Sequence, residues 1–167
     1  MSDPAIEFPT AAVLIGCGAT AFMDVWGVVK ARLWGVPSLD YALLGRWVGH
    51  MPRGRFVHRP IAAAVPVAGE RALGWLIHYL TGIAFAALLL AVWGPGWLDA
   101  PALAPALIIG LGTVLFPFLV MQPALGAGIA ASRTPAPVRA RFHSLVTHAV
   151  FGLGLYLSGL PVGSLLR

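Results

Sequence analysis

Four apolar stretches of about 20 residues constrain this chain more than any other feature of its sequence. They cover residues 10–29, 72–93, 102–121 and 142–160. A helix of about 20 residues rises about 30 Å, which is the thickness of the hydrocarbon core of a bilayer. Only 10% of the 167 residues are charged, whereas a soluble domain has about 25%. The pattern predicts an all-α fold: a bundle of four transmembrane helices in a single membrane domain, residues 1–167.

Positive charges are distributed unevenly over the connections between these stretches. Ten of the eleven Lys and Arg residues lie in or beside the first loop, residues 30–71, and the third loop. Cytoplasmic loops of membrane proteins are enriched in Lys and Arg. The asymmetry therefore predicts that both loops are cytoplasmic and that both termini lie outside. The net charge of +5 does not indicate a nucleic-acid partner, because the cations flank apolar stretches.

The first loop contains the one long polar segment of the sequence. Ser38 is placed to cap a short helix that extends to about Val48. Leu39, Leu43 and Trp47 recur every four residues and give this helix an apolar face. The pattern predicts a short interfacial helix that lies on the inner leaflet of the bilayer.

Three ionisable residues, Asp24, His78 and His148, fall inside the predicted spans. Each lies six or seven residues from a basic residue at the cytoplasmic end of its span. At about 1.5 Å per residue, all three lie about 9–11 Å into the membrane. Each also belongs to a stripe of small residues, which is typical of closely packed helix surfaces. We therefore expect the three side chains to converge in one buried polar site near the cytoplasmic side.

The residue types of this triad fit several roles. Two imidazoles and one carboxylate suit a divalent transition metal such as zinc or iron, and two histidines on facing helices could instead ligate haem. The other interpretations are a proton relay and a hydrogen-bonded group that only locks helices together. Metal or haem binding would make the chain a membrane enzyme or metal-binding protein. A proton relay or a packing role suits a small transporter or accessory subunit, and packing alone suits a purely structural bundle. Four spans are few for a lone transporter, so the second interpretation favours a homodimer.

A second polar cluster lies in the first loop and comprises His50, Arg53, Arg55, His58 and Arg59. Guanidinium groups match phosphate oxygens, so the cluster predicts binding of a phosphate or an anionic lipid headgroup. The alternative is a topology signal with nonspecific attraction to anionic lipid. A topology signal does not require the two histidines.

Two local features complete the prediction. Glu70 and Arg71 are expected to pair with one another or to cap the second span. Pro117 lies inside the third span and predicts a kink, because proline cannot donate a backbone hydrogen bond. The sequence has no Gly-rich phosphate loop, catalytic-serine motif or CxxC pair, and its single cysteine allows no internal disulfide.

Two runs in and after the first loop resemble those of a known family. They are GVPSLDYALLGRWVGHMPRGRF, residues 35–56, and GERALGWLIHY, residues 69–79. Over almost its whole length the chain resembles domain of unknown function 2938, an uncharacterised family of bacterial membrane proteins. The resemblance implies a small multi-span protein of the bacterial inner membrane and implies no activity.

Overall fold

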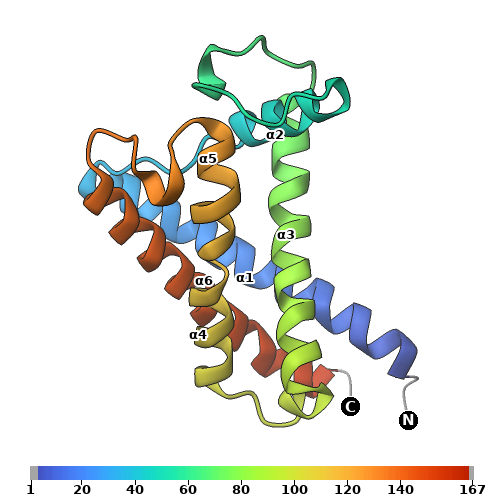
Figure 1. Cartoon of the computed structure of the whole chain (residues 1–167). Helices are drawn as coiled ribbons and strands as arrows, with labels where there is room; N and C mark the ends of the chain where they lie inside the picture. The colour runs from blue at the N-terminus through green and yellow to red at the C-terminus, as the bar shows by residue number, and fades with distance from the viewer. Residues whose placement is uncertain (1–3, 166–167) are drawn as a thin grey trace. The chain divides into compact units, whose positions relative to one another are not determined.

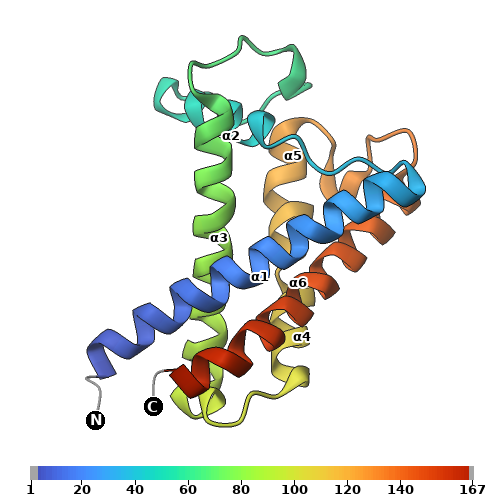
Figure 2. The same cartoon turned by 180° about the vertical axis from the view of Figure 1, so that it is seen from behind.

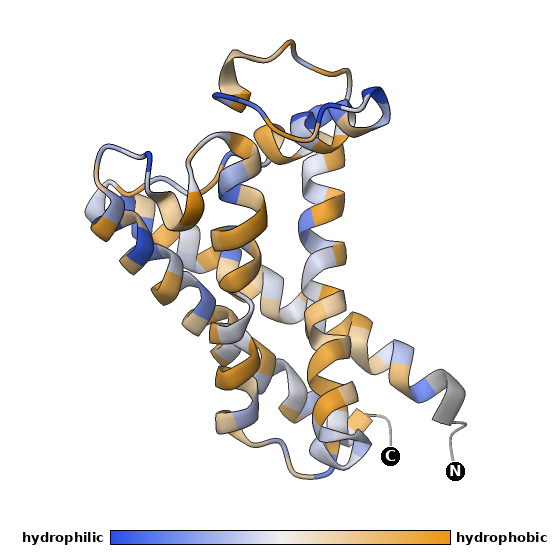
Figure 3. Cartoon of the chain, in the orientation of Figure 1, coloured by the Kyte–Doolittle hydropathy of each residue, from blue (hydrophilic) through white to orange (hydrophobic). Residues whose placement is uncertain are grey.

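Long apolar helices make up most of the computed structural model, which describes residues 4–165 (Figure 1). Four helical segments are long and apolar enough to cross a membrane: Glu7–Trp34, Glu70–Trp93, Leu103–Leu125 and Pro137–Leu165. Apolar residues predominate along them (Figure 3). No strand occurs in residues 4–165. The predicted all-α class and the number of helices that could span a membrane are confirmed.

The helices are joined by short helical turns. The α-helices are α1 (Pro4–Trp34), α2 (Tyr41–His50), α3 (Glu70–Trp93), α4 (Leu103–Gly112), α5 (Gln122–Leu125) and α6 (Pro137–Leu165). The other helical elements are η1 (Met51–Arg53), η2 (Ile61–Ala63), η3 (Pro95–Leu98), η4 (Pro117–Met121) and η5 (Ile129–Ala131). Their contacts divide the described chain into two compact units. The first unit holds residues 4–38, 79–113 and 146–165, and the second holds residues 39–78 and 114–145.

Small residues allow the helices of the first unit to approach one another closely. Gly16 of α1 lies against the backbone of α3, where an added Cβ would be 2.9 Å from the carbonyl carbon of Gly82. Gly82 in turn faces Thr20, and Gly110 of α4 faces the backbone of Gly152 on α6. Helix α1 and the part of α6 in this unit run side by side in opposite directions (Figures 1 and 2). The small-residue stripes expected beside Asp24 and His148 thus lie at helix contacts.

In the second unit, α2 packs against the start of α3 through a pair of glycines. Gly45 faces the carbonyl of Glu70, and Gly74 faces the carbonyl of Tyr41. Trp47, which is only 6% exposed, packs beside Ile61 in the apolar cluster of this unit. Part of the apolar face predicted for α2 is therefore covered by protein.

Helix α2 begins later than predicted, at Tyr41, and it ends at His50. Its N-cap is Asp40, not Ser38, and the Asp40 side chain accepts a hydrogen bond of 3.0 Å from the backbone N–H of Ala42. Both residue types cap helices well, but a carboxylate also interacts favourably with the positive end of the helix dipole.

The third apolar segment is not one regular α-helix. Helix α4 ends at Gly112, a turn occupies residues 113–114, and a π-helix covers Pro117–Met121. Pro117 has no N–H to donate to the carbonyl of Thr113, four residues earlier, and in a regular α-helix its ring would collide with that carbonyl. The expected irregularity at Pro117 is therefore present, and a π-helical turn accommodates it.

Candidate functional site

Asp24 is half-buried on α1 and has a phenol as a hydrogen-bond partner in the first unit. The Tyr79 hydroxyl, on α3, donates to the Asp24 carboxylate at 3.3 Å. This hydrogen bond offsets part of the free-energy cost of placing a carboxylate between two apolar helices. Sequence reasoning missed Tyr79, because it considered only acidic, basic and histidine side chains in the spans.

His148 is half-buried on α6 and is oriented by a hydroxyl group of the same unit. Its Nδ1 lies 2.9 Å from the Thr113 hydroxyl oxygen, and that hydroxyl lies 2.6 Å from the Gly110 carbonyl oxygen. Since a carbonyl only accepts, the single hydroxyl proton goes to Gly110 and His148 Nδ1 is the donor to Thr113. The remaining ring nitrogen, Nε2, then carries the lone pair of the neutral imidazole.

His78 lies in the second unit, where it belongs to an aromatic cluster. Its ring stacks on Tyr41 of α2, with centroids 4.1 Å apart and planes 25° apart. The indole of Trp75 meets the same imidazole edge-on at 5.8 Å. The imidazole therefore contributes to the packing of α2 on α3.

The three residues of the predicted triad thus have different neighbours. Within residues 4–165, no group of three or more His, Cys, Asp or Glu side chains could hold a metal ion. The interpretation of Asp24, His78 and His148 as metal ligands gains no support, and their convergence in one pocket stays a prediction.

The loop that leads into α3 is fixed by one arginine. The Arg46 guanidinium forms a two-pronged ion pair with Glu70, at 2.7 and 2.9 Å, and it also donates to the carbonyls of Ala62 and Ala64 at 3.2 Å. The hydrogen bond to Glu70 raises the pKa of Arg46 above its ordinary value. Glu70 also accepts from the backbone N–H of Val67 at 2.8 Å. The expected pairing of Glu70 with its neighbour Arg71 is therefore replaced by a pairing with Arg46, 24 residues earlier.

His50 and His58, the histidine pair, lie together inside the second unit with their ring centroids 5.2 Å apart. His50 is 3% exposed, and its Nε2 lies 2.9 Å from the Val65 carbonyl oxygen. His50 Nδ1 and both ring nitrogens of His58 are buried without a hydrogen-bond partner in the described chain. Burial lowers the pKa of His58, and the nearby His50 and Arg55 lower it further. The His58 imidazole is thus placed to act as a neutral group.

Three arginines of the same loop have a different environment. Arg53, Arg55 and Arg59 lie in residues 53–59, which we call the arginine loop, and all three are exposed. None of the three guanidinium groups has a hydrogen bond or an ion pair with the residues that the structure describes. The five polar residues that the sequence grouped together thus separate into a histidine pair, of which His50 is buried and His58 half-buried, and three exposed guanidinium groups.

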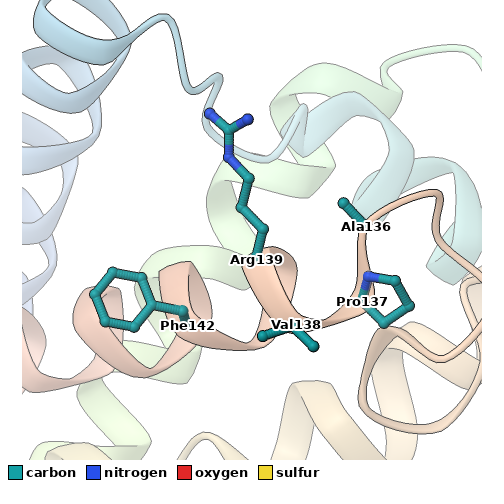
Figure 4. Close-up of a pocket in the computed structure, with 5 residues that line it drawn as sticks. All are labelled: Ala136, Pro137, Val138, Arg139 and Phe142. Carbon is teal, nitrogen blue, oxygen red and sulfur yellow. The ribbon is translucent and has the colours of Figure 1, made fainter.

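A shallow, open hollow of about 560 Å³ lies at the start of α6. Its lining is almost wholly apolar and comprises Ala136, Pro137, Val138, Arg139 and Phe142 (Figure 4). The Arg139 side chain extends away from those of Val138 and Phe142 (Figure 4), and its Nε lies 3.5 Å from His143 Nε2. This lining offers a surface for apolar contact and no set of converging catalytic groups.

Comparison with known protein families gives a match over most of the chain. A sequence model described as "Protein of unknown function (DUF2938)" matches residues 13–162 of the chain. No curated protein and no solved structure matches it.

Proposed function

We propose that this chain, which belongs to the DUF2938 family, is a multi-pass protein of the bacterial inner membrane whose arginine loop binds anionic lipid headgroups on the cytoplasmic side. The observation that carries this proposal is the exposure of three guanidinium groups, on Arg53, Arg55 and Arg59, that no described acidic residue neutralises. Guanidinium groups bind phosphate oxygens through paired N–H donors.

The backbone of the arginine loop is tied to the rest of the second unit at two points. The Trp47 indole N–H donates to the Phe56 carbonyl at 2.8 Å, and the His58 backbone N–H donates to the Ala124 carbonyl at 2.8 Å. Arg55 directly precedes the first of these tethered residues. Because the loop is already ordered, headgroup binding costs little backbone entropy.

Apolar side chains lie between the arginines. Phe56 is 57% exposed and Val57 is 63% exposed. A surface on which cations alternate with exposed apolar groups suits the headgroup region, where the arginines meet phosphates and the apolar groups meet acyl chains. In this proposal the adjacent α2 lies at the inner membrane surface, as its sequence pattern predicts.

Native mass spectrometry of the detergent-purified chain tests the proposal by counting retained lipids. The variant Arg53→Gln/Arg55→Gln/Arg59→Gln should retain about tenfold less phosphatidylglycerol, while its retention of phosphatidylcholine should not change. The matched control is Arg71→Gln/Arg133→Gln/Arg139→Gln, which removes three other exposed arginines and should retain phosphatidylglycerol. Inorganic phosphate is added as a competitor, and its failure to displace the lipid identifies the lipid as the ligand. Equal losses in the two triple variants would instead show nonspecific attraction and refute the proposal.

A second function is favoured by the hydrogen bonds of the first unit, and it involves the residues of the predicted triad. Asp24 with Tyr79, and His148 with Thr113, place proton-carrying groups inside apolar helices, which suits a proton relay or a purely packing role. The variant Asp24→Asn distinguishes the two roles in liposomes that contain a pH-sensitive dye. A relay predicts that proton flux is lost at an unchanged melting temperature, whereas packing predicts a lower melting temperature and no flux in either protein.

A further inference from the structure

We propose that the histidine pair, His50 and His58, binds one transition-metal ion inside the second unit and that copper(I) is the ion it suits best. This site is distinct from the exposed arginines, and it differs from the metal set that the sequence suggested.

The first argument is the tautomer of His50. A carbonyl oxygen only accepts, so His50 Nε2 must carry the proton that is shared with Val65 at 2.9 Å. Nδ1 of the neutral ring is then the lone-pair nitrogen, and it is buried with no hydrogen-bond partner in the described chain. Metal-bound histidines commonly donate their other ring N–H to a backbone carbonyl, which orients the ring and makes it a better ligand.

The second argument is the spacing of the two rings. With metal–nitrogen bonds of about 2.0–2.1 Å, an ion lies about 3 Å from each ring centroid, and a tetrahedral angle of about 109° separates the centroids by about 5 Å. The observed separation is 5.2 Å. Both ring nitrogens of His58 are buried without a partner, so either of them can complete the pair.

The third argument concerns the remaining buried groups. Gln122 Oε1 in the same unit is also buried without a hydrogen-bond partner in the described chain. Buried polar atoms in folded proteins nearly always have a partner, and an ion bound at the histidine pair would supply one to His50 and His58. Met51 and Met121 pack on the apolar cluster of this unit, and thioethers favour copper(I) among the biological metals.

The fourth argument is charge. The two imidazoles are neutral ligands, Arg55 lies close enough to His58 to lower its pKa, and the nearby Glu70 is already paired with Arg46. No ligand charge is therefore available to offset that of a dication. A monovalent ion such as copper(I) has the smaller desolvation cost in this setting.

The test loads the detergent-purified full chain with copper(I), kept reduced by ascorbate, or with zinc(II), against a chromophoric chelator. One copper(I) ion per chain should be retained, and His50→Phe or His58→Phe should lower the affinity at least about tenfold. The matched control is His143→Phe, which changes a histidine at the start of α6 and should keep full affinity. Copper(I) should raise the melting temperature of the unsubstituted chain and of the His143→Phe variant only, because only a ligand that binds the folded state stabilises it.

X-ray absorption on the unsubstituted chain keeps the proposal testable if the variants fail to fold. It should show two imidazole nitrogens at about 1.9–2.1 Å from the copper. The site is refuted if the folded chain retains neither metal, or if His143→Phe loses as much affinity as His58→Phe. Tighter retention of zinc(II) than of copper(I) would refute the assignment to a monovalent ion.

Discussion

The Arg46 guanidinium directs its donors to three different residues, and at the residue scale it is the strongest tie within the second unit. It bonds the Glu70 carboxylate through two donors and the Ala62 and Ala64 carbonyls through a third. Lysine has a single ammonium and cannot reproduce this fork. One side chain thus makes four of the hydrogen bonds that hold the connection between α2 and α3.

Arg46→Lys and Glu70→Gln should each lower the melting temperature by about 2–4 °C, whereas most exposed single cations contribute little. Arg71→Lys is the control, since Arg71 is exposed and adjacent to the same carboxylate. Differential scanning calorimetry of the three variants checks this. A fall as large for Arg71→Lys as for Arg46→Lys would contradict the assignment of the ion pair.

The sequence located the polar residues but could not assign their partners. Arg46 and Arg55 have the same charge and lie nine residues apart, yet one is engaged by Glu70 and the other is exposed. That difference depends on a contact between residues 24 positions apart, which charge counting cannot register. The partners of Asp24 and His148 are hydroxyl groups, and hydroxyl groups are too common in sequences to stand out.

At the scale of helices, the closest packing in the second unit is that of α2 on α3 through Gly45 and Gly74. A Cβ on Gly74 would be in the space of the Tyr41 carbonyl group, and a Cβ on Gly45 in that of the Glu70 carbonyl group. These obstacles are backbone atoms, which cannot rotate out of the way as a side chain can.

Gly74→Ala should therefore destabilise the protein by about 1–3 kcal/mol, because the added methyl group must push α2 away from α3. Gly112→Ala is the matched control, since that glycine is also helical and nothing lies within 4 Å of its added Cβ. The alanine there should be neutral or stabilising by up to about 1 kcal/mol. Chemical denaturation of the two variants measures the difference, and equal stabilities would show that α2 can shift at no cost.

Hydropathy predicted the four long segments because the length of an apolar run is a property of the sequence itself. The ends of the elements were harder to predict. Helix α6 begins at Pro137, five residues before the predicted start of the fourth span, and α2 begins at Tyr41. Helix ends depend on capping groups, and two good capping residues, Ser38 and Asp40, lie two positions apart in the sequence.

At the scale of the whole molecule, the charge asymmetry of the loops predicts the orientation of the chain in the membrane. Reporter fusions at Arg55 and Thr134 should report the cytoplasm, and fusions at Gly96 and Arg167 should report the outside. Paired reporters that are active on opposite sides of the membrane serve as controls for each other. A periplasmic signal at Arg55 would reverse the orientation and remove the arginine loop from the leaflet proposed for it.

The side-chain contacts that hold the first loop in place should also hold it when the chain is cut within that loop. Gly54 is exposed, with φ of 71° and nothing within 4 Å of an added Cβ, and it follows α2 directly through η1. Helix α2 is held to later residues by Arg46 with Glu70 and by Trp47 with Phe56. The peptide bond after Gly54 should thus be dispensable: fragments 1–54 and 55–167, coexpressed with a tag on one, should purify together. The same two fragments carrying Arg46→Lys should separate more readily in detergent. Recovery of the tagged fragment alone would show that the intact peptide chain, and not these side-chain contacts, keeps the two parts of the loop together.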